Sequence, residues 1–103
     1  MIKEENLHYI AGFFEGEGSA GVYRKERGEV VEEVSITQKN PIVLYWIAEI
    51  MSEALIHGHV EKPWKEGAVY RLRFSCINAR MFAKLLYPYL RYQHDKLLPL
   101  INR

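Results

Sequence analysis

Two glutamates alternate with two glycines near the end of an expected helix, in the stretch YIAGFFEGEGS at residues 9–19. The first half of this stretch has helical character, so Glu15 and Glu17 fall where the helix should end. The C-terminus of a helix carries partial negative charge, which makes a carboxylate there unfavourable by roughly 0.3–1 kcal/mol. A divalent cation such as Mg²⁺ would offset this cost, because it prefers oxygen ligands. The residue types therefore indicate divalent-metal chemistry, and the alternative is that Glu17 is a solvated acid at a helix end.

The helix that must position these acids is expected over residues 5–17. One broad apolar face contains Leu7, Ile10, Phe13 and Phe14. Gly12 and Gly16 lie together on a different face, one turn apart. Glycine inside a helix costs about 1 kcal/mol relative to alanine, so a pair on one face suggests that another backbone approaches there. The alternative is that the two glycines only relieve crowding within one chain.

Two expected hairpins supply the strands. The first joins residues 19–25 to 29–38 through a turn at 26–28, and the second joins 59–64 to 68–75 around 65–67. In the strand 29–38, alternation should direct Val30, Val34 and Ile36 to the core and Glu33, Ser35 and Thr37 to the opposite face. Pro63 implies that its strand lies at a sheet edge or is irregular there.

Three more helices complete the expected order. Asn40 followed by Pro41 is a good helix start, and the helix should run over residues 42–55 with Gly58 just past its end. Asn78 is the expected cap of a third helix over residues 79–90, which Pro88 should break or kink. A last short helix is expected at 93–102. The order is helix, two strands, helix, two strands, helix, helix, which contains two successive αββ units.

Composition indicates an ordinary globular protein with a single domain over residues 1–103. The net charge is +1, from 14 basic and 13 acidic residues, and it argues for no partner class by itself. Cys76 is the only cysteine, so a disulfide framework is excluded and a small buried thiol is expected. The sequence has no signal peptide and no apolar run long enough for a membrane. We therefore expect an intracellular setting, cytoplasm or organelle matrix, rather than secretion or a membrane.

The nine residues IAGFFEGEG, at 10–18, resemble the LAGLIDADG motif of homing endonucleases, with isoleucine for the leading leucine and glutamates for the aspartates. The segments TQKNPIVLYWIAEIM, at 37–51, and LLYPYLRYQHDK, at 85–96, are similar to segments around that family's second and third helices. The resemblance covers almost the whole chain. It implies an α+β fold, αββαββα, whose curved antiparallel sheet forms a saddle over double-stranded DNA. One motif per chain implies a symmetric homodimer with Gly12 and Gly16 at the interface.

The resemblance also implies a catalytic site. Glu17 would be the metal-binding acid, with the Gly16 carbonyl as a neighbouring ligand of Mg²⁺ or Mn²⁺. Gln38 matches the family position that hydrogen-bonds the water around the metals. Gln93 aligns with a family lysine that stabilises developing charge. Arg91, His94 and Lys96 are nearby substitutes for that lysine, and of these we choose Lys96. Glu15 lies about 200° around the helix from Glu17, which favours a structural role for it.

DNA contacts are expected on the concave face of the saddle. The candidate residues there are Ser19, Tyr23, Lys25, Ser35, Thr37, Arg71 and Arg73. An arginine can reach a guanine edge through two hydrogen bonds, whereas a lysine mainly holds phosphates. Glu29 and Glu33 should fall on the same face and would repel the DNA backbone, unless a bulge at Glu32 and Glu33 turns one of them away.

Two functions follow from these expectations. The first is a site-specific, divalent-metal-dependent DNA endonuclease that hydrolyses phosphodiester bonds in both strands as a homodimer. The second is a non-cleaving nucleic-acid-binding protein of the same fold, either an intron RNA splicing helper or a DNA-binding regulator. Glu17 favours the endonuclease, whereas Gln93 and the acidic strand favour the second function.

Overall fold

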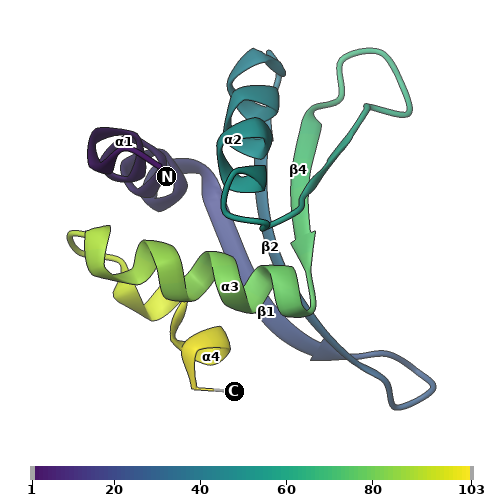
Figure 1. Ribbon diagram of the computed structural model, residues 1–103. Helices are drawn as coiled ribbons and strands as arrows, with labels where there is room; N and C mark the ends of the chain where they lie inside the picture. Colours follow the sequence, from purple (N-terminus) through teal and green to yellow (C-terminus); the bar gives the residue numbers. More distant parts are fainter. Residues whose placement is uncertain (1, 103) are drawn as a thin grey trace.

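The computed structural model describes residues 2–102, and its elements follow the expected order (Figure 1). The elements are α1 (Glu4–Glu17), β1 (Gly18–Arg24), β2 (Val30–Gln38), α2 (Ile42–Ser52), β3 (His59–Glu61), β4 (Tyr70–Ser75), α3 (Ile77–Leu86), the 3₁₀ turns η1 (Tyr87–Tyr89) and η2 (His94–Lys96), and α4 (Leu98–Ile101). Among these described residues, no helix combines the length and the apolar character that a membrane crossing requires.

The four strands form one antiparallel sheet in the order β1-β2-β4-β3, which confirms the expected α+β fold. The register of β2 is continuous from Val30 to Gln38, so the alternative of a bulge at Glu32 and Glu33 is wrong. Simple alternation separates the two acids instead. Glu32 is buried on the helix side, where its carboxylate lies 3.1 Å from Arg80 Nε, and Glu33 lies on the opposite face.

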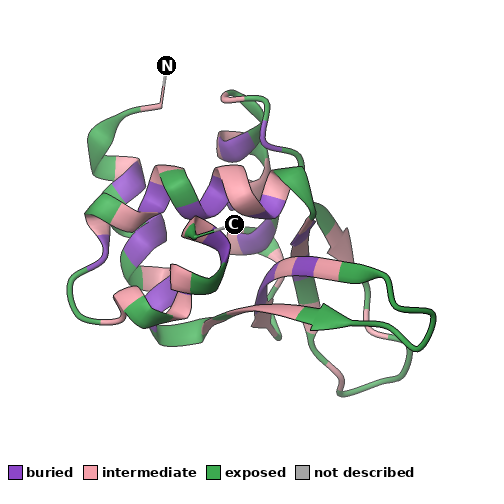
Figure 2. Cartoon of the chain, turned by 90° about the horizontal axis from the view of Figure 1, so that it is seen from below, coloured by how far each residue is buried: buried purple, intermediate pink, exposed green. Residues whose placement is uncertain are grey.

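The helices cover one face of this sheet and enclose the core with it (Figure 1). The fully buried strand residues are Val34, Ile36, Leu72 and Phe74, and α1, α2 and α3 contribute Ile10, Phe14, Leu44, Ile47, Met51, Phe82 and Leu86. Figure 2 shows buried segments on the helices and the central strands, whereas the hairpin ends are exposed. Val30 belongs to such an end, so its expected burial is wrong. No helix of residues 2–102 covers the other face of the sheet (Figure 1).

The start of α3 differs from the expectation. Asn78 lies inside α3 and does not cap it, because the residue before the helix is Cys76, at φ 55°. Asn78 Oδ1 accepts a hydrogen bond of 2.9 Å from the His57 N–H and so ties the loop after α2 to α3. Cys76 is exposed, which corrects its expected burial. The residue before α2 is Pro41, and Asn40 lies one position earlier, where its Oδ1 accepts a hydrogen bond of 3.0 Å from the Ile42 N–H at the start of the helix.

The chain after Pro88 is less regular than expected. In place of one helix over 93–102, the structure has η2 and the four-residue α4, and only the described residues up to 102 can be compared. Leu97 and Leu100 are nevertheless fully buried, so this segment is held by packing rather than by helical hydrogen bonds. The strand expected at 59–64 ends at Glu61, before Pro63, as the proline implied.

Candidate functional site

Glu17 is the last residue of α1 and is exposed, at the point where the chain turns directly into β1. The turn needs a glycine at position 18, because a Cβ there would overlap the ring of Phe14. The Gly18 N–H donates to the Phe14 carbonyl and so closes the helix. The sequence therefore places the Glu17 carboxylate at the surface, at the negative end of a helix, without a linker that would let it move away.

Glu15, two residues earlier, is 3% exposed and points into the protein. Its carboxylate accepts three backbone hydrogen bonds, from the N–H groups of Arg91 (3.0 Å), Tyr92 (2.9 Å) and Gln93 (2.7 Å). Burial raises the pKa of Glu15, but the three N–H donors lower it by more than burial raises it. The pKa of Glu15 therefore lies below its ordinary value. The structural role expected for Glu15 is thus to anchor the segment after Pro88 to the end of α1.

Lys96 closes the same helix end from the outside. Its Nζ donates to the carbonyls of Glu15 (2.6 Å) and Gly18 (3.0 Å), and more weakly to that of Phe14 (3.4 Å). An ammonium has three donors, so these contacts use all of them. Lys96 therefore stabilises the carbonyl end of α1 by position and by charge. In this arrangement Lys96 holds the helix that carries Glu17, and its three contacts are all with backbone carbonyls.

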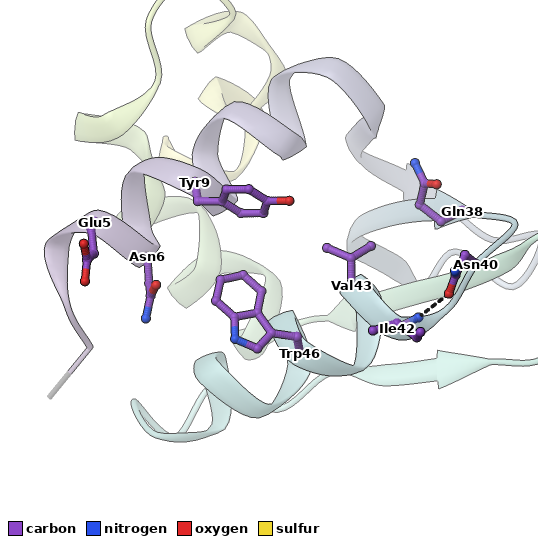
Figure 3. A pocket seen from close by; sticks show the side chains of 8 residues that line it. All are labelled: Glu5, Asn6, Tyr9, Gln38, Asn40, Ile42, Val43 and Trp46. Carbon is purple, nitrogen blue, oxygen red and sulfur yellow. Dashed lines mark hydrogen bonds between the residues drawn. The ribbon is translucent and has the colours of Figure 1, made fainter.

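Gln38 ends β2 and lines a groove of about 720 Å³ between α1 and α2 (Figure 3). The groove is also lined by Glu5, Asn6, Tyr9, Asn40, Ile42, Val43 and Trp46. Tyr9 and Trp46 meet edge to face with ring centroids 5.5 Å apart. The Gln38 amide lies at the edge of this groove, on the β2 side, so it is available to water or to a partner.

Gly12 and Gly16 are both exposed on the outer face of α1. A Cβ added at either position would meet no atom within 4 Å, counting the part of the chain that the structure describes. Crowding within one chain therefore does not require these glycines, which removes the alternative explanation for the pair. Tyr9, 56% exposed, stacks on Phe13 beside them with centroids 6.3 Å apart. This face of α1 is smooth, apolar and open.

A metal ion would find few ligands in one chain. Between residues 2 and 102, no group of three or more His, Cys, Asp or Glu side chains is placed to hold an ion. Glu17 supplies one carboxylate, and the Gly16 carbonyl is not among those that Lys96 contacts. This oxygen donor set suits Mg²⁺ or Mn²⁺, which use one or two carboxylates and complete their shell with water and phosphate. A complete site needs oxygen atoms from outside the chain.

The open face of the sheet brings most of the predicted DNA-binding residues together. Ser19, Ser35 and Arg73 lie side by side in the register, as do Thr37 and Arg71. The Ser19 and Ser35 hydroxyls are 3.0 Å apart, and Ser35 is only 8% exposed, so little of its surface is open to a ligand in this structure. Two expected members lie off the strands, because β1 ends at Arg24 and β2 begins at Val30, which leaves Lys25 and Glu29 in the hairpin turn.

Four charged side chains and the neutral Tyr23 form one network on this open face, which we call the ionic ladder: Tyr23, Glu33, Arg73, Glu61 and Arg71. The Tyr23 hydroxyl donates to Glu33, Arg73 Nη1 lies 3.3 Å from Glu33, Arg73 Nη2 lies 3.4 Å from Glu61, and Arg71 Nε donates to Glu61 at 2.8 Å. Burial, then the hydrogen bond to Glu33, raises the pKa of Tyr23 to about 12, and the Arg71 hydrogen bond lowers the pKa of Glu61.

Sequence reasoning missed Glu61, because its partners come from the β3–β4 register rather than from its neighbours in the chain. Glu61 pairs directly with Arg71 across the strands, and Arg73 is the next residue on the same face. Opposite charges at such positions attract. Pairing the expected strands 59–64 and 68–75 residue by residue in the sequence would have placed Glu61 opposite Arg71.

Comparisons with known proteins identify a family that the chain matches and solved structures that share its fold. A family model described as a LAGLIDADG-like domain matches residues 4–87. No curated protein sequence matches the chain. Among solved structures, the group I intron-encoded homing endonuclease I-CeuI complexed with DNA has a TM-score of 0.74 and 20% identity, covering 99% of this chain and 53% of that chain.

Two further structures extend the comparison. The homing endonuclease I-CvuI in complex with the I-CreI target has a TM-score of 0.66 and 17% identity, covering 91% of this chain and 62% of that one. The homing endonuclease I-TnaI has a TM-score of 0.54 and 22% identity, covering 92% and 66%. At these identities the similarity establishes the fold alone. The chain spans 53–62% of the length of the I-CeuI and I-CvuI chains.

Proposed function

Because the chain belongs to the LAGLIDADG-like domain family, we propose that it is a site-specific DNA endonuclease that requires a divalent metal ion and acts as a homodimer. The observation that carries this proposal is the end of α1. An exposed carboxylate, Glu17, stands at a helix terminus next to an open face that contains Gly12 and Gly16. Nothing within the described residues packs on this face at the two glycines, which leaves room there for a second copy of the chain.

The shape of this face supports the proposed pairing of two copies. Because neither glycine has a side chain, two α1 helices can approach closely at a two-fold axis, where each copy contributes the same surface. The apolar groove between α1 and α2 continues this surface with Tyr9 and Trp46. Two copies of Glu17 would then lie near each other at two negative helix ends, which is unfavourable unless cations lie between them.

The proposed ion is Mg²⁺ or Mn²⁺, held by the Glu17 carboxylate and the Gly16 carbonyl of each copy. When bound, such an ion activates a water molecule and stabilises the leaving oxygen of a phosphodiester. Gln38 would orient water at the edge of the same site through its amide. Glu15 and Lys96 would act indirectly, because they fix the helix end on which Glu17 stands.

Double-stranded DNA would lie against the open face of the sheet. Tyr23, Thr37, Arg71 and Arg73 present polar groups there, and Lys25 stands at the tip of the β1–β2 hairpin, beside the expected path of the phosphates. Ser19 contributes a hydroxyl that Ser35 supports from below. Arginine suits base edges and lysine suits phosphates, so the sheet would read sequence and the hairpin tip would hold the backbone.

A second function is favoured by two observations. The three donors of Lys96 are used at the helix end, and Gln93 has a neutral amide where the resemblance to the family implies a lysine that would stabilise a transition state. The ionic ladder also neutralises the two arginines of the open face. A protein of this fold that binds nucleic acid without cutting it, such as an intron RNA splicing helper or a DNA-binding regulator, would have these properties.

Incubation with a randomised DNA library and Mg²⁺, followed by sequencing of the cut ends, tests the endonuclease. The wild type should cut a small subset of sequences, and Glu17→Gln should lose activity by about 100-fold or more. Glu49→Gln, on the exposed surface of α2, is the matched control and should cut normally. Binding without cleavage by the wild type would leave the second function, and equal cleavage by wild type and Glu17→Gln would refute the site assignment.

A further inference from the structure

The ionic ladder leaves specific donors of its two arginines free. Arg71 donates to Glu61 with Nε, and this bond leaves both terminal nitrogens, Nη1 and Nη2, for an external ligand. The Arg71 side chain is 44% exposed, so these nitrogens reach the surface. Arg73 donates to Glu33 with Nη1, and its Nη2 lies 3.4 Å from Glu61 in an ion pair, so both of its terminal nitrogens face acids, and its side chain is 39% exposed. Arg71 is therefore the arginine whose two parallel donors remain together.

Two parallel donors match the O6 and N7 atoms of guanine in the major groove. They would equally well match two phosphate oxygens, and for a free arginine the phosphate is the more abundant partner on any duplex. The ionic ladder shifts the preference of Arg71 from phosphate towards the base edge, because its two arginines and two glutamates sum to zero charge. A neutral group gains little from the phosphate field but can still form hydrogen bonds to a base edge.

The two acids are also held firmly in place. The Glu33 side chain is 15% exposed and Glu61 is 28% exposed, so both lie below the arginines that they contact. Glu33 is fixed further by the Tyr23 hydroxyl, and Glu61 bridges both arginines with its two oxygens. The acids are therefore placed to hold the guanidinium groups rather than to meet a ligand themselves.

We propose that Glu61, supported by Glu33, is a positioning residue that makes Arg71 selective for guanine and suppresses binding of this sheet to DNA of random sequence. The inference rests on the proposed function, since it takes duplex DNA as the ligand of the open face. It adds a residue that the DNA contacts themselves do not include, and it names the base that Arg71 reads. It also accounts for acidic side chains on a face that binds a polyanion.

The first measurement is binding to a labelled duplex of random sequence, by fluorescence anisotropy without divalent metal, over a range of salt concentrations. Glu61→Gln should bind roughly three- to tenfold more tightly than the wild type, and the slope of log affinity against log salt should steepen by about one per released arginine. Glu49→Gln makes the same change in net charge on α2 and should bind as the wild type does. Circular dichroism checks that each variant is folded.

The second measurement uses a duplex selected by the wild type from a randomised pool. Glu61→Gln should lose about tenfold of the preference for this duplex over random DNA. Arg71→Lys keeps the charge but lacks the fork, so it should lose a similar preference while its affinity for random DNA stays within about twofold. Replacing one guanine at a time by 7-deazaguanine removes N7, and one such position should weaken the wild type but not Arg71→Lys.

The outcomes separate this inference from the proposed function. If the wild type binds a selected duplex and Glu61→Gln behaves like Glu49→Gln in both measurements, the positioning role is refuted and DNA binding stands. If only Glu61→Gln binds random duplex, the suppression is supported and the endonuclease proposal is weakened. If neither protein binds any duplex, both proposals are refuted.

Discussion

Replacing Glu15 by glutamine tests whether this buried acid holds the two ends of the candidate site together. The carboxylate accepts hydrogen bonds from three consecutive backbone N–H groups, at residues 91–93, with distances of 2.7–3.0 Å. Glutamine has nearly the same shape, but one of its two terminal atoms is a donor. The substitution therefore removes the charge and turns one acceptor into a group that faces another donor.

The magnitude follows from those three bonds. A hydrogen bond to a charged group contributes about 1.5–3 kcal/mol, and a neutral one about 0.5–1.5 kcal/mol. Glutamine can keep its oxygen towards Tyr92 and Gln93 as neutral bonds, while the Arg91 N–H meets its NH₂ group. We expect a loss of about 2–4 kcal/mol in the free energy of unfolding. Glu15 is 3% exposed, so solvent offers no replacement acceptor.

Urea unfolding followed by circular dichroism measures this loss, at one protein concentration because dimer formation would make stability concentration-dependent. Glu49→Gln, an exposed site on α2, is the control and should stay within about 0.5 kcal/mol of the wild type. Hydrogen exchange at the amides of residues 91–93 should also accelerate in Glu15→Gln. Equal stability of the two variants would refute the reasoning.

The same bonds predict a dependence on pH. The pKa of Glu15 is lower in the folded protein than its ordinary value of 4.5, so the unfolded chain binds its proton first as the pH falls. Stability from Glu15 is therefore complete above about pH 4.5 and is lost as the pH falls through the lower, folded pKa. The difference between wild type and Glu15→Gln should shrink over that acidic range. A difference that does not change with pH would show that the carboxylate charge is not responsible.

Two further predictions concern α1 and the turn after α2. Gly12→Ala should stabilise the isolated chain by about 1 kcal/mol, because the new methyl group meets no atom within 4 Å outside its own helix backbone. The same substitution should weaken the proposed dimer, and analytical ultracentrifugation over a dilution series measures the dissociation constant of that dimer. An unchanged dissociation constant would rule out Gly12 at the interface. Leu55→Gly should raise stability by about 1 kcal/mol in thermal or urea unfolding, since Leu55 is 71% exposed and has a left-handed φ of 61°; a loss of stability would contradict this.

Much of the fold could be predicted because it depends on local patterns. The helical spacing in α1, the alternation in β2 and the Asn40–Pro41 start of α2 all appear in neighbouring residues, and the structure has these elements within a few residues of the expected bounds. The errors occurred where tertiary contacts override local preference. Asn78 could have capped α3, but its side chain accepts from His57 instead, and the chain after Pro88 is shaped by the burial of Leu97 and Leu100.

The candidate site divides in the same way. Glu17 at the end of a helix and the glycine pair on one helix face were visible in the sequence, since both depend only on helical spacing. The purpose of Glu15 was not visible, because its partners are 76 to 78 residues further along the chain. Lys96 was noticed for its charge, but only the structure shows that this charge lies against the carbonyl end of α1.

By itself, the sequence determined the order of the elements, the family and the position of the exposed acid, because each of these is encoded in the spacing of nearby residues. Only the tertiary structure decided which charges neutralise one another. Glu33, Glu61, Arg71 and Arg73 come from three strands, and they meet because the register of β2, β4 and β3 aligns them on one face. An ion pair depends on distance in space, and distance along the chain does not specify it.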